Sequence, residues 1–158
     1  MAAPATTARG APPGYKMPDG FKTTIAFAKK ANVNFWEKTV KPPSIEGGDK
    51  IDTTTMLNTA WRTSDARHLK TLSESTAMVA YDPDVLPEIL TLVNNPGSIT
   101  VHFPDNSTLD FYGFMSKFEI GDHKEGEMPE ATVTICPTNW DPVNFVEVGP
   151  VFTAASGT

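Results

Sequence analysis

Residues 45–72 read IEGGDKIDTTTMLNTAWRTSDARHLKTL and separate two regions of strand-like sequence. Three consecutive threonines, Thr53–Thr55, favour extended backbone, whereas Asn58 and Asp65 favour turns, so no packed element is expected to continue through the stretch. A long loop in a compact domain is usually functional or disordered. This one carries apolar side chains that a solvated loop does not need, namely Ile51, Met56, Leu57 and Trp61. The sequence therefore predicts an arm that buries these groups against another surface.

Length and composition indicate a single folded domain. The chain has 158 residues, 39% of them apolar and 20% charged, which is enough to bury a core. A net charge of −6 argues against nonspecific attraction to nucleic acid or anionic lipid. The single cysteine, Cys136, excludes an internal disulfide framework and fits a reducing cytosol. No run approaches the roughly 18 apolar residues of a membrane span.

The two ends of the chain differ from its middle. Residues 1–20 are rich in Ala, Pro and Gly and lack the apolar core of a signal peptide, so they predict a flexible arm. Residues 149–158 predict a flexible tail. The folded domain is expected over residues 21–148, interrupted by the long loop at about 42–67.

The sequence before the loop predicts two strands. Residues 21–28 alternate with the two-residue period of a half-buried strand, and residues 33–41 alternate again. A short polar connection at 29–32 predicts that they pair as an antiparallel hairpin, which Pro42 ends. The expected core face of the first strand comprises Phe21, Thr23, Ile25 and Phe27.

A long strand is expected at residues 69–81, and both of its faces mix polar and apolar groups. The face that carries Lys70, Glu74 and Thr76 is expected to meet water or another subunit instead of the core.

One convincing helix is expected, at about residues 83–95. Its apolar positions repeat at spacings of three and four, Asp84 is the expected cap, and Asn94 to Gly97 should end it. The apolar positions are Val85, Leu86, Ile89, Leu90 and Val93.

Strand patterns return after the helix. Residues 98–103 and 107–118 predict two strands joined by a turn at 104–106, with Gly113 as a candidate bulge. Residues 130–136 predict the last clear strand, and residues 138–148 predict a further edge strand or a closing flap. About seven strands and one helix indicate a mainly β protein, an antiparallel sandwich or barrel with the helix over one opening.

The sequence offers little catalytic chemistry. His68, His102 and His123 lie in separate elements without metal-ligand spacing, and Cys136 ends an apolar strand, where a buried inert thiol is expected. No phosphate-binding loop or nucleophile motif occurs, so neither enzyme activity nor a cofactor is expected. The three tryptophans suggest a carbohydrate-binding sandwich as an alternative class, although core or interface anchoring is the commoner role of tryptophan. They are Trp36, Trp61 and Trp140.

The order of several short motifs resembles the major tail tube proteins of long-tailed, siphovirus-like bacteriophages over residues 21–148. The motifs are Gly47-Gly48, Ile51–Thr54, Trp61-Arg62, Leu69–Thr71, Tyr81–Pro83, Ile99–Val101, Phe103–Asp105 and Pro129–Ala131. The resemblance implies a β-sandwich with one flanking helix. It also implies six copies in a ring, and rings stacked into a tube through which the genome passes. A bacterial secretion-system tube is the nearest alternative.

The resemblance also implies partners and site residues. The partners are further copies of the chain, the tape measure, terminator and tip proteins of the tail, and genomic DNA that passes without specific binding. The expected location is the virion tail, after assembly in the host cytoplasm. The expected subunit interface comprises Ile51, Asp52, Thr53, Met56, Leu57, Trp61 and Arg62. The expected lumen-facing residues are Lys70, Glu74 and Thr76, on a wall that is net acidic.

Overall fold

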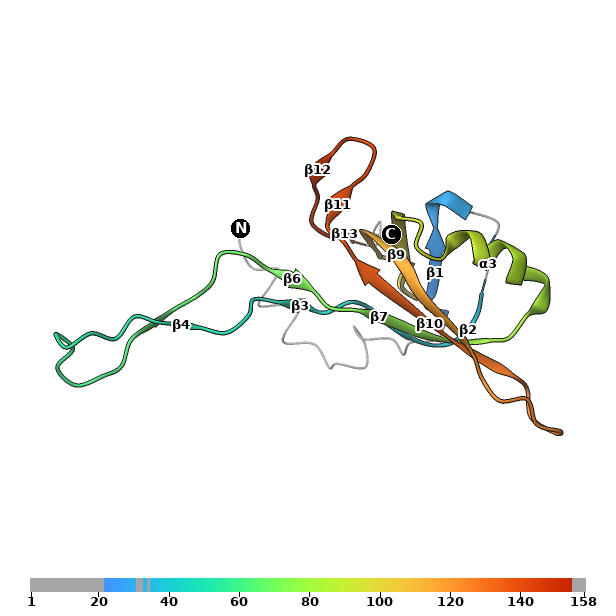
Figure 1. Ribbon diagram of the computed structural model, residues 1–158, viewed down its shortest axis with the longest axis horizontal. Coiled ribbons are helices and arrows are strands. Elements are labelled where there is room, and N and C mark those ends of the chain that lie inside the picture. Colours follow the sequence, from blue (N-terminus) through green and yellow to red (C-terminus); the bar gives the residue numbers. More distant parts are fainter. Residues whose placement is uncertain (1–21, 31–32, 34, 155–158) are drawn as a thin grey trace.

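The computed structural model describes residues 22–30, 33 and 35–154. Its body is one seven-stranded antiparallel sheet in the order β1-β8-β9-β10-β7-β2, with β13 paired to β9 (Figure 1). These strands are Thr24–Phe27 (β1), Trp36–Lys41 (β2), Ser75–Ala80 (β7), Gly97–His102 (β8), Thr108–Ile120 (β9), Glu130–Pro137 (β10) and Val151–Thr153 (β13). Short strands form three two-stranded pairs: Ile45–Glu46 (β3) with Thr71–Leu72 (β6), Ile51–Asp52 (β4) with Ser64–Asp65 (β5), and Trp140–Asp141 (β11) with Val146–Glu147 (β12).

One face of the sheet forms the core. Alternate residues of β7, β10, β8 and β9 are buried because successive side chains of a strand point to opposite faces. They include Ser75, Ala77, Val79, Ile99, Val101, Phe111, Met115, Ala131, Val133 and Ile135. Ile25 and Phe27 of β1 are buried as predicted, while Phe21 lies outside the described residues. The predicted mainly β fold with an antiparallel sheet is confirmed.

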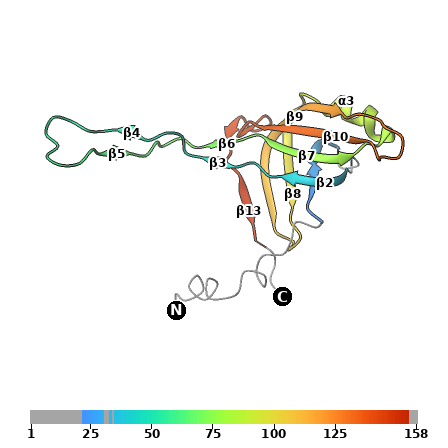
Figure 2. The same ribbon diagram turned by 90° about the horizontal axis from the view of Figure 1, so that it is seen from below.

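The sheet curls until its two edge strands face one another (Figure 2). The backbone N–H of Ile25 in β1 donates to Glu37 Oε1 in β2 at 3.0 Å. The predicted hairpin between these two strands is wrong, because β1 pairs with β8 and β2 pairs with β7. The Glu37 carboxylate thus bridges the seam, which is the gap between the edge strands β1 and β2, where no backbone ladder forms. The body is therefore an incompletely closed barrel.

The predicted helix is present but shorter. A 3-10 turn, Pro83–Val85 (η2), leads into α3, Leu86–Leu92, and a second 3-10 turn, Ala28–Lys30 (η1), follows β1. The cap is Asp82 and not Asp84, because the Asp82 carboxylate accepts the Asp84 N–H at 3.0 Å. Ile89 and Leu92 are buried against the core. Leu90 is exposed, so it does not belong to the buried face of the helix as predicted.

The β8–β9 hairpin forms where it was predicted, but Gly113 is not its bulge. Gly113 pairs in register with both Gly97 and Pro137. A Cβ at Gly113 would lie 2.7 Å from the carbonyl oxygen of Cys136, so glycine permits close approach of the backbones. The register shift lies further along β9, opposite Thr134 and Ile135.

The last strand is interrupted by an excursion at residues 138–150. Strand β10 pairs with β9 as far as Gly113, and β13 resumes the pairing with Val151 opposite Asp110. Between them β11 and β12 form a hairpin that projects from the sheet (Figure 1). Residues 138–148 therefore form a separate hairpin, where an edge strand of the sheet or a closing flap was predicted. The predicted flexible tail is also wrong for β13, which belongs to the sheet.

Candidate assembly surface

The stretch predicted as an irregular loop is a long two-stranded arm that extends away from the body (Figures 1 and 2). Its root is fixed by the Ser73 N–H, which donates to Ser44 O at 2.8 Å, and by the β3–β6 pair. Further out, the Thr53 N–H donates to Thr63 O at 3.0 Å beyond the β4–β5 pair. The Thr53 hydroxyl also donates to the Thr63 hydroxyl at 3.0 Å. The threonines hold the arm extended without a core of their own.

The tip of the arm is a polar turn that displays apolar side chains. The Asn58 carboxamide accepts the Thr55 N–H at 2.8 Å and donates to Trp61 O at 2.9 Å. The apolar residues of the tip are fully exposed, with Met56 at 102%, Leu57 at 90% and Trp61 at 84%. No residue from 44 to 71 is buried. The turn is therefore built by hydrogen bonds, and its apolar groups have no partner within the arm.

All seven residues of the expected interface lie on this arm. Ile51 and Asp52 form β4 on its shaft, whereas Met56, Leu57, Trp61 and Arg62 lie at its tip. The nearby Thr54 side chain, and then the Thr54 N–H that donates to Asp52 Oδ1 at 2.9 Å, lower the pKa of Asp52. Asp52 therefore stays ionised at neutral pH and fixes the start of the turn.

A buried carboxylate, Asp141, holds the β11–β12 hairpin together through hydrogen bonds, and the sequence did not predict it. Asp141 is 4% exposed and accepts the N–H groups of Val143 at 2.9 Å and Asn144 at 3.3 Å. It also accepts the Asn144 side-chain N–H at 2.8 Å and the Tyr112 hydroxyl at 3.4 Å. The Val143 hydrogen bond is the main cause that lowers the pKa of Asp141, against the opposing effect of burial. The signal was the turn-forming sequence Asp-Pro-Val-Asn at 141–144.

The turn of the β11–β12 hairpin presents a second exposed apolar surface. Phe145 has a positive φ of 55° and is 73% exposed, and Val143 beside it is 77% exposed. Burial and the neighbouring Asp141 raise the pKa of Tyr112, which keeps its hydroxyl proton for the hydrogen bond to Asp141. The hairpin is thus held in one shape while its apolar side chains face outward.

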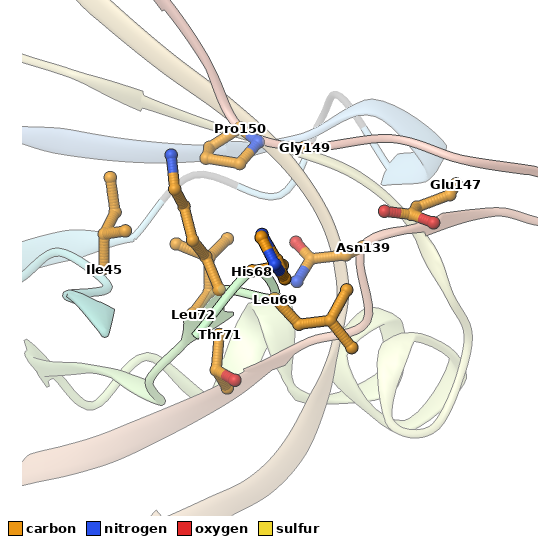
Figure 3. Close-up of a pocket in the computed structure, with 10 residues that line it drawn as sticks. Ile45, His68, Leu69, Thr71, Leu72, Asn139, Glu147, Gly149 and Pro150 are labelled. Atoms are coloured by element: carbon orange, nitrogen blue, oxygen red, sulfur yellow. The ribbon is translucent and has the colours of Figure 1, made fainter. Parts of the chain in front are cut away.

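A groove of about 540 Å³ lies between the arm root and the base of the hairpin (Figure 3). Its lining residues are Ile45, His68, Leu69, Lys70, Thr71 and Leu72 from the arm root, and Asn139, Glu147, Gly149 and Pro150 from the hairpin base. Asn139 has a positive φ of 53°, and its buried Oδ1 accepts no hydrogen bond from any described residue. The groove therefore combines apolar walls with an unsatisfied acceptor.

The three expected lumen-facing residues do not lie on one strand. Strand β6 ends at Leu72, which is buried, and β7 begins at Ser75, so the alternation breaks between them. Thr76 lies on the outer face of β7, while Glu74 lies between the two strands and accepts a weak hydrogen bond from Cys136 Sγ at 3.6 Å. Lys70 lines the groove.

The described residues give no sign of a metal centre or a membrane helix. Within 22–154, outside the gaps at 31–32 and 34, no group of three or more His, Cys, Asp or Glu side chains is placed to hold a metal ion. None of the helices in that part of the chain is both long and apolar enough to cross a membrane.

Three exposed tryptophans lie on three different elements, Trp36 on β2, Trp61 at the arm tip and Trp140 on β11.

Solved structures resemble the chain, whereas no protein-family model and no curated protein sequence matches it. A chain from the virion of a native gene transfer agent particle is 10% identical, with a TM-score of 0.62 over 86% of this chain and 98% of that one. A chain from the tail of the empty particle, computed with C6 symmetry, is 9% identical, with a TM-score of 0.59 over the same shares. The sheath-tube complex of an extracellular contractile injection system contains a chain that is 9% identical, with a TM-score of 0.62 over 90% and 95%.

The fold is of the tail-tube type. The matches cover most of both chains. At identities of 9–10% the likeness is one of fold. The fold implied by the resemblance is thus confirmed.

Proposed function

We propose that this chain is the building block of a bacteriophage tail tube. The observation that carries the proposal is the arm, because its exposed Met56, Leu57 and Trp61 require a surface that its own domain does not supply. Large exposed apolar groups of this kind mark interaction sites. On a fold of the tail-tube type, the expected partner is another copy of the same chain.

Six copies would close one ring, and rings would stack into the tube. The symmetry is supported by the similar chain from a tail described with C6 symmetry. Contacts between different patches of identical subunits close into a ring at a fixed rotation and extend as a helix when they do not close. The open strand edges at the β1–β2 seam would meet neighbouring subunits, which protects them from uncontrolled pairing. Contacts within a ring would therefore use the strand edges, and contacts between stacked rings would use the arm.

The outer face of β7 and β10 would line the lumen. Thr76, Thr132 and Thr134 give this face short uncharged side chains. Two nearby lysines are paired with carboxylates, Lys38 with Glu130 and Lys117 with Glu119, the latter pair at 3.0 Å. DNA binds through phosphate contacts to free cations, so paired lysines would let the genome slide. Glu74 would add negative charge at the end of this face.

The proposed location is the tail of the virion, after assembly in the cytoplasm of a bacterial host. There the tube would contact the tape measure protein inside it and the terminator and tip proteins at its ends. A tube of a contractile injection system is the second candidate, favoured by the similar chain from a sheath-tube complex. Neighbouring capsid genes would support the phage tail, whereas neighbouring sheath and effector genes would support the injection system.

The proposal is tested by negative-stain microscopy of the purified full chain over a range of concentrations. The expected result is rings or tubes of uniform diameter. A protein that stays monomeric at every concentration, or that binds sugars on a glycan array, would overturn the tube function.

A further inference from the structure

We propose that the groove between the arm root and the β11–β12 hairpin receives the arm tip of a second copy of this chain. The inference rests on the proposed tube function and names the surface on which the arm docks. It follows from two features of the same molecule that lack partners, the apolar tip and the groove.

The chemistry of the groove matches a mixed apolar and polar side chain. Its volume of about 540 Å³ lies in the range of pockets that bury compact ligands. Ile45 and Leu69 present apolar surface at 65% and 81% exposure. The buried Oδ1 of Asn139 accepts nothing from the described residues, and such an orphan acceptor marks a missing donor. The occupant should therefore bring both apolar surface and an N–H group.

Trp61 meets both requirements. Its indole has a large apolar surface and a single N–H that can only donate, so it would satisfy Asn139 Oδ1 once the Asn139 carboxamide, whose oxygen is buried, turns toward the ring in the groove. Trp61 is 84% exposed, and Leu57 of the same tip is 90% exposed, so both are free to dock. Exposed aromatic anchors that fill pockets carry much of the energy of protein interfaces.

The charges of the two surfaces also match. Arg62 is the only charged residue between Thr53 and Ser64. Glu147 is the only acid among the described residues that line the groove, and it lies on the hairpin side (Figure 3). Lys70 and His68 line the arm-root side. A tip that enters with Arg62 toward the hairpin would pair with Glu147 and avoid the lysine, which fixes its orientation.

The occupant cannot be the tip of the same chain. Leu57 lies twelve residues beyond Ile45 at the arm root. At about 3.3 Å per residue of extended strand, the tip is roughly 40 Å from its own groove. Figures 1 and 2 agree that the arm points away from the body. Docking must therefore join two copies through different patches, a contact that repeats from subunit to subunit.

Disulfide trapping tests the contact directly, because Cys136 is the only cysteine. In a Cys136→Ser background, a tagged Ala60→Cys chain, which keeps Trp61, and an untagged Leu69→Cys chain are mixed under assembly conditions and oxidised. The expected product is a mixed disulfide dimer. A matched control replaces Leu69→Cys with Leu90→Cys, on the 71% exposed position of α3, and should give no mixed dimer.

Charge exchange tests the orientation. Arg62→Glu and Glu147→Arg should each raise the concentration needed for tube formation by about tenfold or more, because each places like charges in the contact. The double variant should return to within about threefold of the unchanged protein. Lys50→Glu, on the shaft of the arm, should change nothing. Circular dichroism of each variant shows that its fold is intact.

The outcomes separate the docking site from the tube function. Tubes from the unchanged protein without the mixed disulfide and without rescue by the double variant would overturn the groove assignment alone. Absence of any polymer from the unchanged protein would overturn both proposals. Cross-linking of the Leu69→Cys chain to a Met17→Cys chain, with none to the Ala60→Cys chain, would assign the groove to the N-terminal segment and also overturn this inference.

Discussion

The body and the arm differ in where their apolar side chains lie. In the body, Phe111, Val133 and Ile135 are at most 1% exposed and belong to one buried cluster that also includes residues of α3. In the arm, every residue from 44 to 71 is exposed or half-buried, although the same stretch carries Met56, Leu57 and Trp61. Stability therefore resides in one part of the chain and unpartnered apolar surface in the other, so substitutions should separate the two properties.

The largest loss of stability is expected from Phe111→Ala in the body. The side chain is 1% exposed, and its removal leaves a cavity that the packed sheet cannot fill. The free energy of unfolding should fall by about 3–5 kcal/mol. Urea denaturation followed by circular dichroism measures the change. A loss below about 1 kcal/mol would show that this part of the core can repack.

A smaller loss is expected at the seam of the body. Glu37→Ala leaves the Ile25 N–H without its acceptor, which should cost about 1–3 kcal/mol of unfolding free energy. Glu37→Gln keeps a carbonyl acceptor at the same place and serves as the matched control. Faster hydrogen exchange of the Ile25 amide in the alanine variant alone would localise the effect. Equal exchange in all three proteins would contradict the carboxylate bridge.

A local effect of pH is expected at the β11–β12 hairpin. The folded protein lowers the pKa of Asp141, so this stabilisation is present above the unfolded value of about 3.9 and is lost as pH falls through the lower folded value. Fluorescence of Trp140, in a Trp36→Phe, Trp61→Phe background, should report the opening of the hairpin in acid. Asp141→Asn should remove this transition. A transition of equal size in the asparagine variant would assign it to other carboxylates.

The smallest change in stability should accompany the largest change in assembly. Deletion of residues 56–62 removes the arm tip, which buries nothing in its own domain. The unfolding free energy should stay within about 0.5 kcal/mol of the intact protein. Negative-stain microscopy should show no tubes. Long tubes from the deletion variant would mean that the arm is dispensable, and a large loss of stability would mean that the arm supports the body.

The two-residue period was the most informative part of the sequence. Ala131, Val133 and Ile135 are buried and Thr132 and Thr134 face outward, as the alternation predicts. Periodicity assigns a residue to a face but does not name the neighbouring strand. The wrong pairing of residues 21–28 with 33–41 shows this limit, because β8 competes for β1 and comes from much later in the chain.

The groove could not be predicted from the sequence, again because periodicity does not say which segments become neighbours. Its two walls, at Leu69 and Asn139, are separated by most of the sheet-forming sequence and meet only after β7, β9 and β10 have paired. The interface residues were easier to find, because Met56 and Trp61 stand out as apolar groups among turn formers. Local chemistry identifies an unusual segment, while the surface that complements it depends on the whole fold.

The interrupted last strand has a consequence for how such proteins change over time. Pro137 and Val151 pair with positions only three residues apart on β9, so the chain leaves the sheet and returns to it almost at the same place. The β11–β12 excursion can therefore lengthen, shrink or be exchanged for another segment without disturbing the ladder on either side. Its outer turn, beyond the residues that line the groove, is a natural site at which a lineage could insert new loops, or at which an engineer could display a foreign peptide.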